Sequence, residues 1–200
     1  MKYNILVNTV NDHLRHKKTL MKFIDDFENL YDTRVSSDVA ISNHTESINK
    51  NGSKRVVAKN ISTDWEVPEE INRQYLDYFY NDVIEPVMNT IGIGLGFEYF
   101  DWTIKNSWFQ KYSEGGEHGW HNHSNSQFTN CYYLELPDSS YKTEVLGRDG
   151  KIIEFDVKEG DVLTIPAWMK HRSPPNGKER KTVIAFNSNY QLLADNKSSI

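Results

Sequence analysis

The chain is short of cysteine and of long apolar runs. Its single cysteine, Cys131, excludes a disulfide within the chain and is typical of a reducing compartment. No segment approaches the roughly 20 consecutive apolar residues that a membrane-spanning helix needs. The apolar run near the start is too short for a signal peptide, and basic residues follow it instead of preceding it. These absences predict a soluble, cytoplasmic protein.

Positive charge is also scarce. Lys and Arg together number 23 against 28 Asp and Glu, so the net charge is −5. The longest basic block covers only residues 15–18. Bulk nucleic acid is bound mainly through neutralisation of its phosphates by clustered Lys and Arg. We therefore expect no bulk nucleic-acid partner, while a nucleotide-sized substrate stays open.

Apolar and aromatic bulk is plentiful. Hydrophobic residues make up 38% of the 200 residues and aromatic residues 12%, which predicts one compact domain with a packed core. Residues 1–96 are expected to form a helical support region packed on that core. A first helix begins after Asp12, and its apolar positions recur three or four residues apart at Leu14, Leu20, Phe23, Ile24, Phe27 and Leu30. After a loop at residues 42–60, a second helix is expected from Pro68 to Pro86.

The hydrophobic period changes after residue 96. Strands are expected at residues 97–112, 128–136, 151–157, 161–166 and 181–187, with a hairpin turn at 148–150 that joins 141–146 to 151–157. Short strands at this spacing predict a sandwich, a jelly roll or a barrel. The glycine-rich residues 91–96 follow a helix and precede a strand, so we interpret them as a flexible connector and not as a dinucleotide-binding loop.

Three of the seven histidines, His118, His121 and His123, lie within six residues of one another. Residues two apart on an extended segment face the same side, so His121 and His123 can bind one metal ion together. His118 would face the other side of such a strand. We expect it in an exposed loop, with a contact to the ligands or to substrate as the alternative.

A third metal ligand is expected from His171, which follows a strand and a turn. Arg180 begins the next strand nine residues later, with Thr182 on the same face. A guanidinium binds a carboxylate through two hydrogen bonds, and a nearby hydroxyl adds a third. This arrangement suits a dicarboxylate that chelates the metal with one end and is held at the other.

At these positions the chain resembles the iron(II)- and 2-oxoglutarate-dependent oxygenases, and most of all the small phage and bacterial proteins related to prolyl hydroxylases. The resemblance covers about residues 97–190. The matching residues are His121, His123, His171, Arg180 and Thr182, with Asn106 to Trp108, Tyr112, Tyr132 to Leu134, Pro137, Gly160 to Leu163 and Pro166. The family implies a double-stranded β-helix, a variant of the jelly roll, for residues 97–200, in agreement with the strand pattern.

The resemblance also implies roles for individual residues. His121 and His171 would bind iron, Arg180 would bind the far carboxylate of 2-oxoglutarate, and Tyr112 or Tyr133 would assist it. Residues expected to line the pocket or contact the ligands are Trp108, His118, Asn130 and Asn187.

The chain departs from the family at His123, where the usual triad of two histidines and a carboxylate has Asp or Glu. A neutral imidazole leaves the ion one unit more positive and so changes its redox behaviour. A working three-histidine site, a two-histidine site completed by water, and an inactive relic all remain open. We favour an active site with His121, His123 and His171 as the metal ligands.

The expected function is therefore an iron(II)- and 2-oxoglutarate-dependent dioxygenase that hydroxylates an unactivated C–H bond. Dioxygen is the second cosubstrate, and the primary substrate is unknown, with a peptide suggested by family analogy. If the chain is phage-encoded, it would act in the host cytoplasm. The alternatives are a cupin-like three-histidine metalloenzyme that works without 2-oxoglutarate, and a non-catalytic virion or interaction protein that retains the fold.

Overall fold

The computed structural model describes residues 4–33, 44–48, 54–58 and 60–193. Its largest element is a six-stranded antiparallel sheet with the strand order β1-β9-β7-β11-β5-β4. The strands of this large sheet are β1 (Leu6–Thr9), β4 (Ile61–Thr63), β5 (Phe100–Tyr112), β7 (Phe128–Glu135), β9 (Asp161–Pro166) and β11 (Lys181–Leu192). The edge strands β1 and β4 come from the part of the chain before residue 97.

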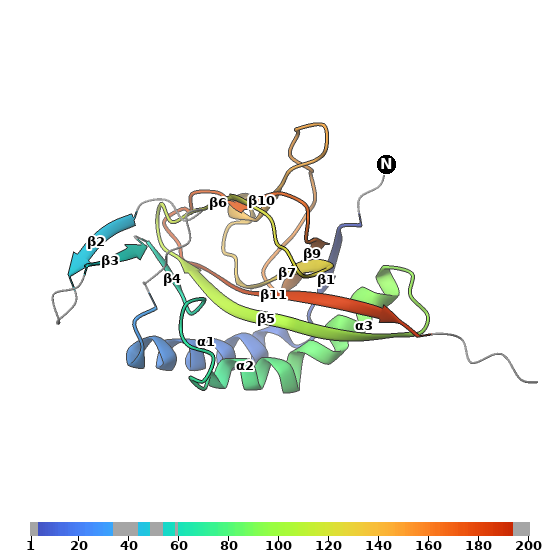
Figure 1. Ribbon diagram of the computed structural model, residues 1–200, viewed down its shortest axis with the longest axis horizontal. Coiled ribbons are helices and arrows are strands. Elements are labelled where there is room, and N and C mark those ends of the chain that lie inside the picture. Colours follow the sequence, from blue (N-terminus) through green and yellow to red (C-terminus); the bar gives the residue numbers. More distant parts are fainter. Residues whose placement is uncertain (1–3, 34–43, 49–53, 59, 194–200) are drawn as a thin grey trace, which may run out of the picture.

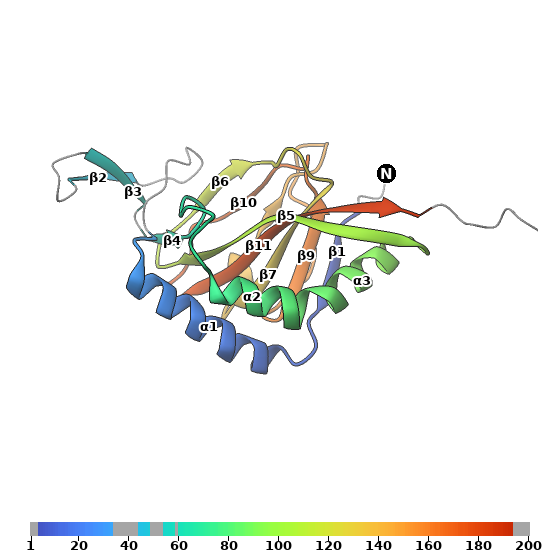
Figure 2. The same cartoon turned by 60° about the horizontal axis from the view of Figure 1, so that its bottom comes forward.

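A second, three-stranded sheet covers one face of the large sheet (Figure 2). It has the order β6-β10-β8, formed by β6 (His118–His121), β10 (His171–Ser173) and β8 (Glu144–Val145). Apolar side chains, among them Leu163, Ile165 and Val183, are buried as one cluster in this part of the fold. The mostly β architecture with a jelly-roll core is therefore confirmed, whereas the division of the chain at residue 96 stays a prediction.

Helices cover the other face of the large sheet (Figures 1 and 2). They are α1 (His13–Leu30), α2 (Gln74–Phe79), the π-helical turn η1 (Tyr80–Ile84) and α3 (Glu85–Gly94). Leu20, Ile24 and Phe27 on α1 are buried in one cluster with Phe109 and Phe186 of the sheet. Because this layer buries the outer face of β7 and β11, the inner face of the same strands is left to build the site.

Two helix boundaries differ from those that the sequence predicts. The second helix begins at Gln74 and not at Pro68, because Pro68 lies in a turn in which its carbonyl accepts from Ile71 N at 3.1 Å. Pro86, which was expected to kink or end the helix, does not end it: the π-helical turn η1 leads directly into α3, and the backbone at Ile84 and Glu85 stays helical. The helix therefore continues to Gly94, so the expected connector at residues 91–96 is mostly helical.

The strand predictions also need correction. Residues 151–157 form no strand and make one isolated bridge, between Leu146 and Ile152. The expected loop at residues 42–60 contains the hairpin β2 (His44–Ile48) and β3 (Lys54–Ala58), and its turn at residues 51 and 52 lies outside the described residues. Within the described ranges, no helix has the length and apolar character needed to cross a membrane.

Candidate metal centre

Neighbouring strands of the small sheet bring His121 and His171 together. His121 ends β6, His171 begins β10, and the two residues are direct partners in the antiparallel register. His121 Nδ1 donates to Gly119 O at 2.7 Å, and His171 Nδ1 donates to Met169 O at 3.0 Å. A ring nitrogen that donates to a carbonyl places the imidazole lone pair on the other nitrogen. Both rings therefore present Nε2 as the metal-binding atom.

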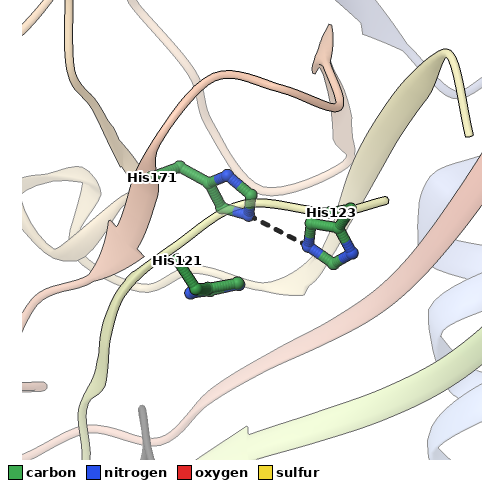
Figure 3. A group of neighbouring side chains, drawn as sticks. All are labelled: His121, His123 and His171. Atoms are coloured by element: carbon green, nitrogen blue, oxygen red, sulfur yellow. Dashed lines mark hydrogen bonds between the residues drawn. The ribbon is translucent and has the colours of Figure 1, made fainter. Parts of the chain in front are cut away.

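His123 completes the cluster from the loop after β6. Its backbone N donates to Ala167 O at 2.9 Å, which ties this loop to the turn before β10. Its Nε2 lies 3.3 Å from His171 Nε2, and candidate ligand atoms of the three histidines all lie within 4.8 Å of one another (Figure 3). Two imidazole nitrogens about 2.1 Å from one ion stand roughly 3.0–3.4 Å apart at tetrahedral or octahedral angles. The spacing of His123 and His171 therefore suits one shared ion.

The protonation state of His171 also suits a metal ligand. Only 8% of the residue is exposed, and this burial, together with the charge of neighbouring His121, lowers the pKa of His171 to about 3. The ring is therefore neutral near pH 7. Neutral imidazole is the form that binds metal ions, and an all-histidine set of three is an established ligand set for Zn²⁺.

His118 is buried, so the expectation of an exposed loop is wrong. Its ring stacks on His121 with centroids 4.0 Å apart and planes 15° apart. The side-chain amide of Gln110 donates to His118 Nδ1 at 3.2 Å and accepts from Tyr112 Oη at 2.7 Å. In the turn before β6, Gly116 packs against the backbone of Asn60, where a Cβ would stand 2.3 Å from the Asn60 carbonyl oxygen. His118 thus packs on a candidate ligand, as the alternative interpretation proposed.

A cavity lies beside the three histidines. Its lining includes four residues that the sequence placed at the pocket, namely Trp108, Tyr112, His118 and Asn130. It also includes Lys181, which is only 2% exposed. Lys181 Nζ donates to Tyr141 O at 2.8 Å and to Ser173 Oγ, and stands 4.3 Å from the centre of the Tyr112 ring.

Lys181 brings positive charge into this cavity. Burial lowers the pKa of Lys181 to about 8, so the ammonium remains mostly charged near pH 7. Its partner Ser173 lies two residues after His171 on β10, about 7 Å along the strand. The other cation in the lining, Arg172, is paired with Glu144 at 2.6 Å.

Arg180 and Thr182 do not face this cavity. Arg180 Nε and Nη2 each donate to the carboxylate of Glu135 at 2.8 Å, and Thr182 Oγ1 donates to the same carboxylate. Along β11, the cavity is lined by Lys181, Val183 and Ala185. Side chains alternate across a strand, so an error of one residue places a side chain on the opposite face. We correct the assignment accordingly, because the cation of β11 that lines the cavity is Lys181.

Two further expected site residues lie elsewhere. Tyr133 is fully buried outside the cavity lining, and its hydroxyl accepts from Thr143 N at 3.0 Å. Asn187 lines a groove that adjoins His123. Sequence reasoning missed Lys181, Gln110 and Ser173. The adjacent basic pair at residues 180–181 was a signal for a cation here, but the pair does not tell which member points inward.

No family model and no curated protein matches the chain. Several solved structures are similar to it across most of their length. A prolyl-4-hydroxylase of Pseudomonas putida has 12% identity and a TM-score of 0.55, with 96% of this chain and 95% of that chain covered. An oxidoreductase of the 2OG-Fe(II) oxygenase family from Burkholderia pseudomallei has 9% identity and a TM-score of 0.51, with coverages of 89% and 91%.

A third similar structure is a full-length protein of Neurospora crassa in complex with alpha-KG, at 14% identity and a TM-score of 0.54, with 94% of this chain and 76% of that chain covered. At such identities the likeness shows the fold alone. The resemblance that the histidine motif indicated is thereby confirmed at the level of the fold. The chain has the double-stranded β-helix fold of the iron(II)- and 2-oxoglutarate-dependent oxygenases.

Proposed function

We propose that the chain is an iron(II)- and 2-oxoglutarate-dependent oxygenase that hydroxylates an unactivated C–H bond. The proposal depends on one observation: three imidazoles converge on a point, and a buried Lys181 ammonium stands in the adjoining cavity. A cluster of neutral nitrogen ligands binds a metal cation, while a buried ammonium binds an anion. Their combination suits an anionic ligand that also chelates the metal.

Each residue then has a distinct part. His121, His123 and His171 would hold iron(II) through Nε2, and Lys181 with the Ser173 hydroxyl would hold the far carboxylate of 2-oxoglutarate. When bound, iron(II) with 2-oxoglutarate and dioxygen supplies oxidative decarboxylation to succinate and carbon dioxide, coupled to hydroxylation of a substrate C–H bond.

Apolar walls of the cavity limit the access of water. These walls include the side chains of Leu163, Ile165 and Val183, which are 1%, 2% and 4% exposed. Charges interact more strongly in such a site than in water. The pairing of the Lys181 ammonium with a carboxylate is correspondingly stronger here than on the surface.

His123 has an electrostatic consequence. In the usual triad a carboxylate cancels one of the two charges of iron(II), whereas three imidazoles cancel none. A 2-oxoglutarate dianion would supply the missing negative charge. We therefore expect iron(II) to bind weakly alone and much more tightly with 2-oxoglutarate. By linkage, 2-oxoglutarate should also bind more tightly when iron(II) is present, by the same factor.

Anaerobic calorimetry with iron(II), with and without 2-oxoglutarate, tests the proposal. We expect at least a tenfold gain in metal affinity from the cosubstrate, which corresponds to about 1.4 kcal/mol. His171→Ala should abolish binding in both arms. Absence of iron binding by the wild-type protein in both arms would support the non-catalytic alternative.

A set of three histidines also fits an alternative function, that of a cupin-like metalloenzyme that works without 2-oxoglutarate. Such an enzyme would bind the metal equally well with and without the dicarboxylate. Succinate release under air in the presence of iron(II) and 2-oxoglutarate separates the two, because only the proposed oxygenase forms it.

A further inference from the structure

A polar groove continues the cavity past the metal ligands. His123 lines both the cavity and this groove. The cavity and the groove lie along the same face of two adjacent strands. On this face four residues of β5 pair in register with four residues of β11, namely Tyr112 with Lys181, Gln110 with Val183, Trp108 with Ala185, and Asn106 with Asn187. The first three pairs line the cavity, and the pair Asn106–Asn187 lines the groove. The groove therefore adjoins the candidate metal centre at His123.

Most of the groove lining consists of uncharged hydrogen-bonding groups, with Lys105 as its one ammonium. Its described lining has no carboxylate, and besides His123 and the exposed Lys105 it consists of Trp65, Asn106, Asn122, Ser124, Asn125, Ser126 and Asn187. Its volume of about 450 Å³ falls within the roughly 300–1,000 Å³ of small-molecule sites. The size and composition fit a ligand of one or two rings that is neutral and rich in polar groups.

Two polar atoms of this lining have no hydrogen-bond partner among the described residues. Asn187 is only 4% exposed, and its Nδ2 donates to Asn106 Oδ1 at 2.8 Å, yet its Oδ1 accepts from no group. Ser126 Oγ is likewise buried and without a partner. Buried polar atoms are nearly always hydrogen-bonded. Because these two atoms are covered by protein, the groups that a ligand in the groove can reach are the exposed amides and hydroxyl of Asn122, Asn125 and Ser124.

Aromatic rings form one wall. Trp65 is 46% exposed, its ring packs edge-on against Trp108 with centroids 4.4 Å apart, and Trp108 stacks on His123 at 5.9 Å. A large exposed indole next to a metal ligand gives a flat apolar surface in a groove that is otherwise polar.

We propose that this groove binds a neutral carbohydrate, and that a ring C–H bond of the sugar is the one that the enzyme hydroxylates. The hydroxylation of the sugar rests on the proposed function, whereas the binding of the sugar does not. A sugar ring has an apolar face of C–H bonds that packs on an indole, and a rim of hydroxyls that both donate and accept, as side-chain amides do. A peptide would bring side chains that need apolar or charged subsites, and the groove's described lining offers Trp65 as its one apolar surface.

Saturation-transfer NMR tests this inference, with a panel of neutral di- and trisaccharides built on glucose, galactose, mannose and N-acetylglucosamine. Neutral tripeptides of similar size form the second arm. Both arms use apo protein and protein loaded with Zn²⁺ and 2-oxoglutarate, which carries out no oxidation. We expect saturation of saccharide ring C–H protons, and affinity about tenfold weaker in Trp65→Ala and in Asn187→Leu, as for the loss of one or two ligand contacts.

Trp168→Ala is the matched control, because Trp168 is 50% exposed and lies outside the groove lining. It should bind saccharide as the wild type does. Trp65 is exposed, so Trp65→Ala remains informative if Asn187→Leu fails to fold. The inference is overturned if no saccharide binds, if only peptides bind, or if both variants bind as the wild type does. Failure to bind Zn²⁺ and 2-oxoglutarate, with saccharide binding intact, would instead overturn the proposed function alone.

Discussion

The proposed binding of an anion in the cavity depends on a single buried ammonium. Lys181 is 2% exposed, and its pKa falls to about 8 because burial disfavours the charged form. Its hydrogen bonds to Tyr141 O and Ser173 Oγ keep the side chain in place. Neighbouring Arg180 is almost half exposed at 45% of its side chain and is already paired with Glu135. Two adjacent cations therefore have different environments and different uses.

This contrast predicts opposite results for two substitutions. Lys181→Met should weaken 2-oxoglutarate binding by about 100-fold, since truncating one partner of a buried charge pair costs roughly 2–5 kcal/mol. Arg180→Ala should leave the affinity unchanged, because exposed ion pairs contribute little. Calorimetry in the presence of Zn²⁺ measures both. The assignment fails if Arg180→Ala is the weaker binder.

The same measurement has a pH dependence with a defined sign. Below pH 8 Lys181 is charged and binds the carboxylate fully. As the pH rises above about 8, the free protein loses this proton, so the affinity should fall in the wild type. Lys181→Met should lack this fall.

At the scale of elements, one buried carboxylate fastens the segment before α2 to β5. Asp64 has a fully buried side chain, accepts from Phe109 N at 2.9 Å and from Arg73 Nε at 2.8 Å, and also accepts from Tyr75 Oη. Its neighbour in sequence is Trp65, the aromatic wall of the groove. The position of that wall therefore depends on the Asp64 hydrogen bonds.

Asp64→Ala should destabilise the fold by about 3–5 kcal/mol, because it leaves the buried Arg73 and a backbone N–H without their partner. Urea unfolding measures this. Asp26→Ala is the matched control, since among the described residues Asp26 makes only an exposed ion pair with Lys22. Equal midpoints for the two variants would contradict the anchoring role of Asp64.

At the scale of the whole molecule, the three histidines connect two strands of the small sheet with the loop that enters β7. A metal ion bound only by the folded state stabilises it by about 2.7 kcal/mol at 100 times the dissociation constant. The stability of the metal-free fold also depends on pH, because His171 has a pKa of about 3 in the folded state and about 6.5 when unfolded.

The sign follows from linkage. Between pH 6.5 and 3 the unfolded chain binds a proton at residue 171 that the folded chain excludes, so stability falls as the pH falls. The metal-free protein should therefore melt at a lower temperature at pH 5 than at pH 7.5, and Zn²⁺ should raise the melting temperature at pH 7.5. No Zn²⁺-induced rise in the wild type would contradict the metal site, and an equal fall between pH 7.5 and pH 5 in His171→Asn would contradict the burial of a neutral His171.

Much of the site was readable from local spacing. Alternation along an extended chain placed His121 and His123 together, and His171 was found at a turn after a strand. Short strands at this spacing predicted a sandwich, a jelly roll or a barrel, and the resemblance to the oxygenases implied the jelly roll. These features depend on a few neighbouring residues each, so a sequence carries them directly.

Other features depend on contacts between distant segments. Each of three features requires a partner strand in a particular register. These features are the opposite orientations of Arg180 and Lys181, the hydrogen bonds among Tyr112, Gln110 and His118, and the pairing of Asn187 with Asn106. The sequence by itself determined which chemical groups are available and their local periodicity. Only the tertiary structure decided which of these groups point into the same cavity, because the direction of each side chain depends on the pairing of strands that are far apart in the chain.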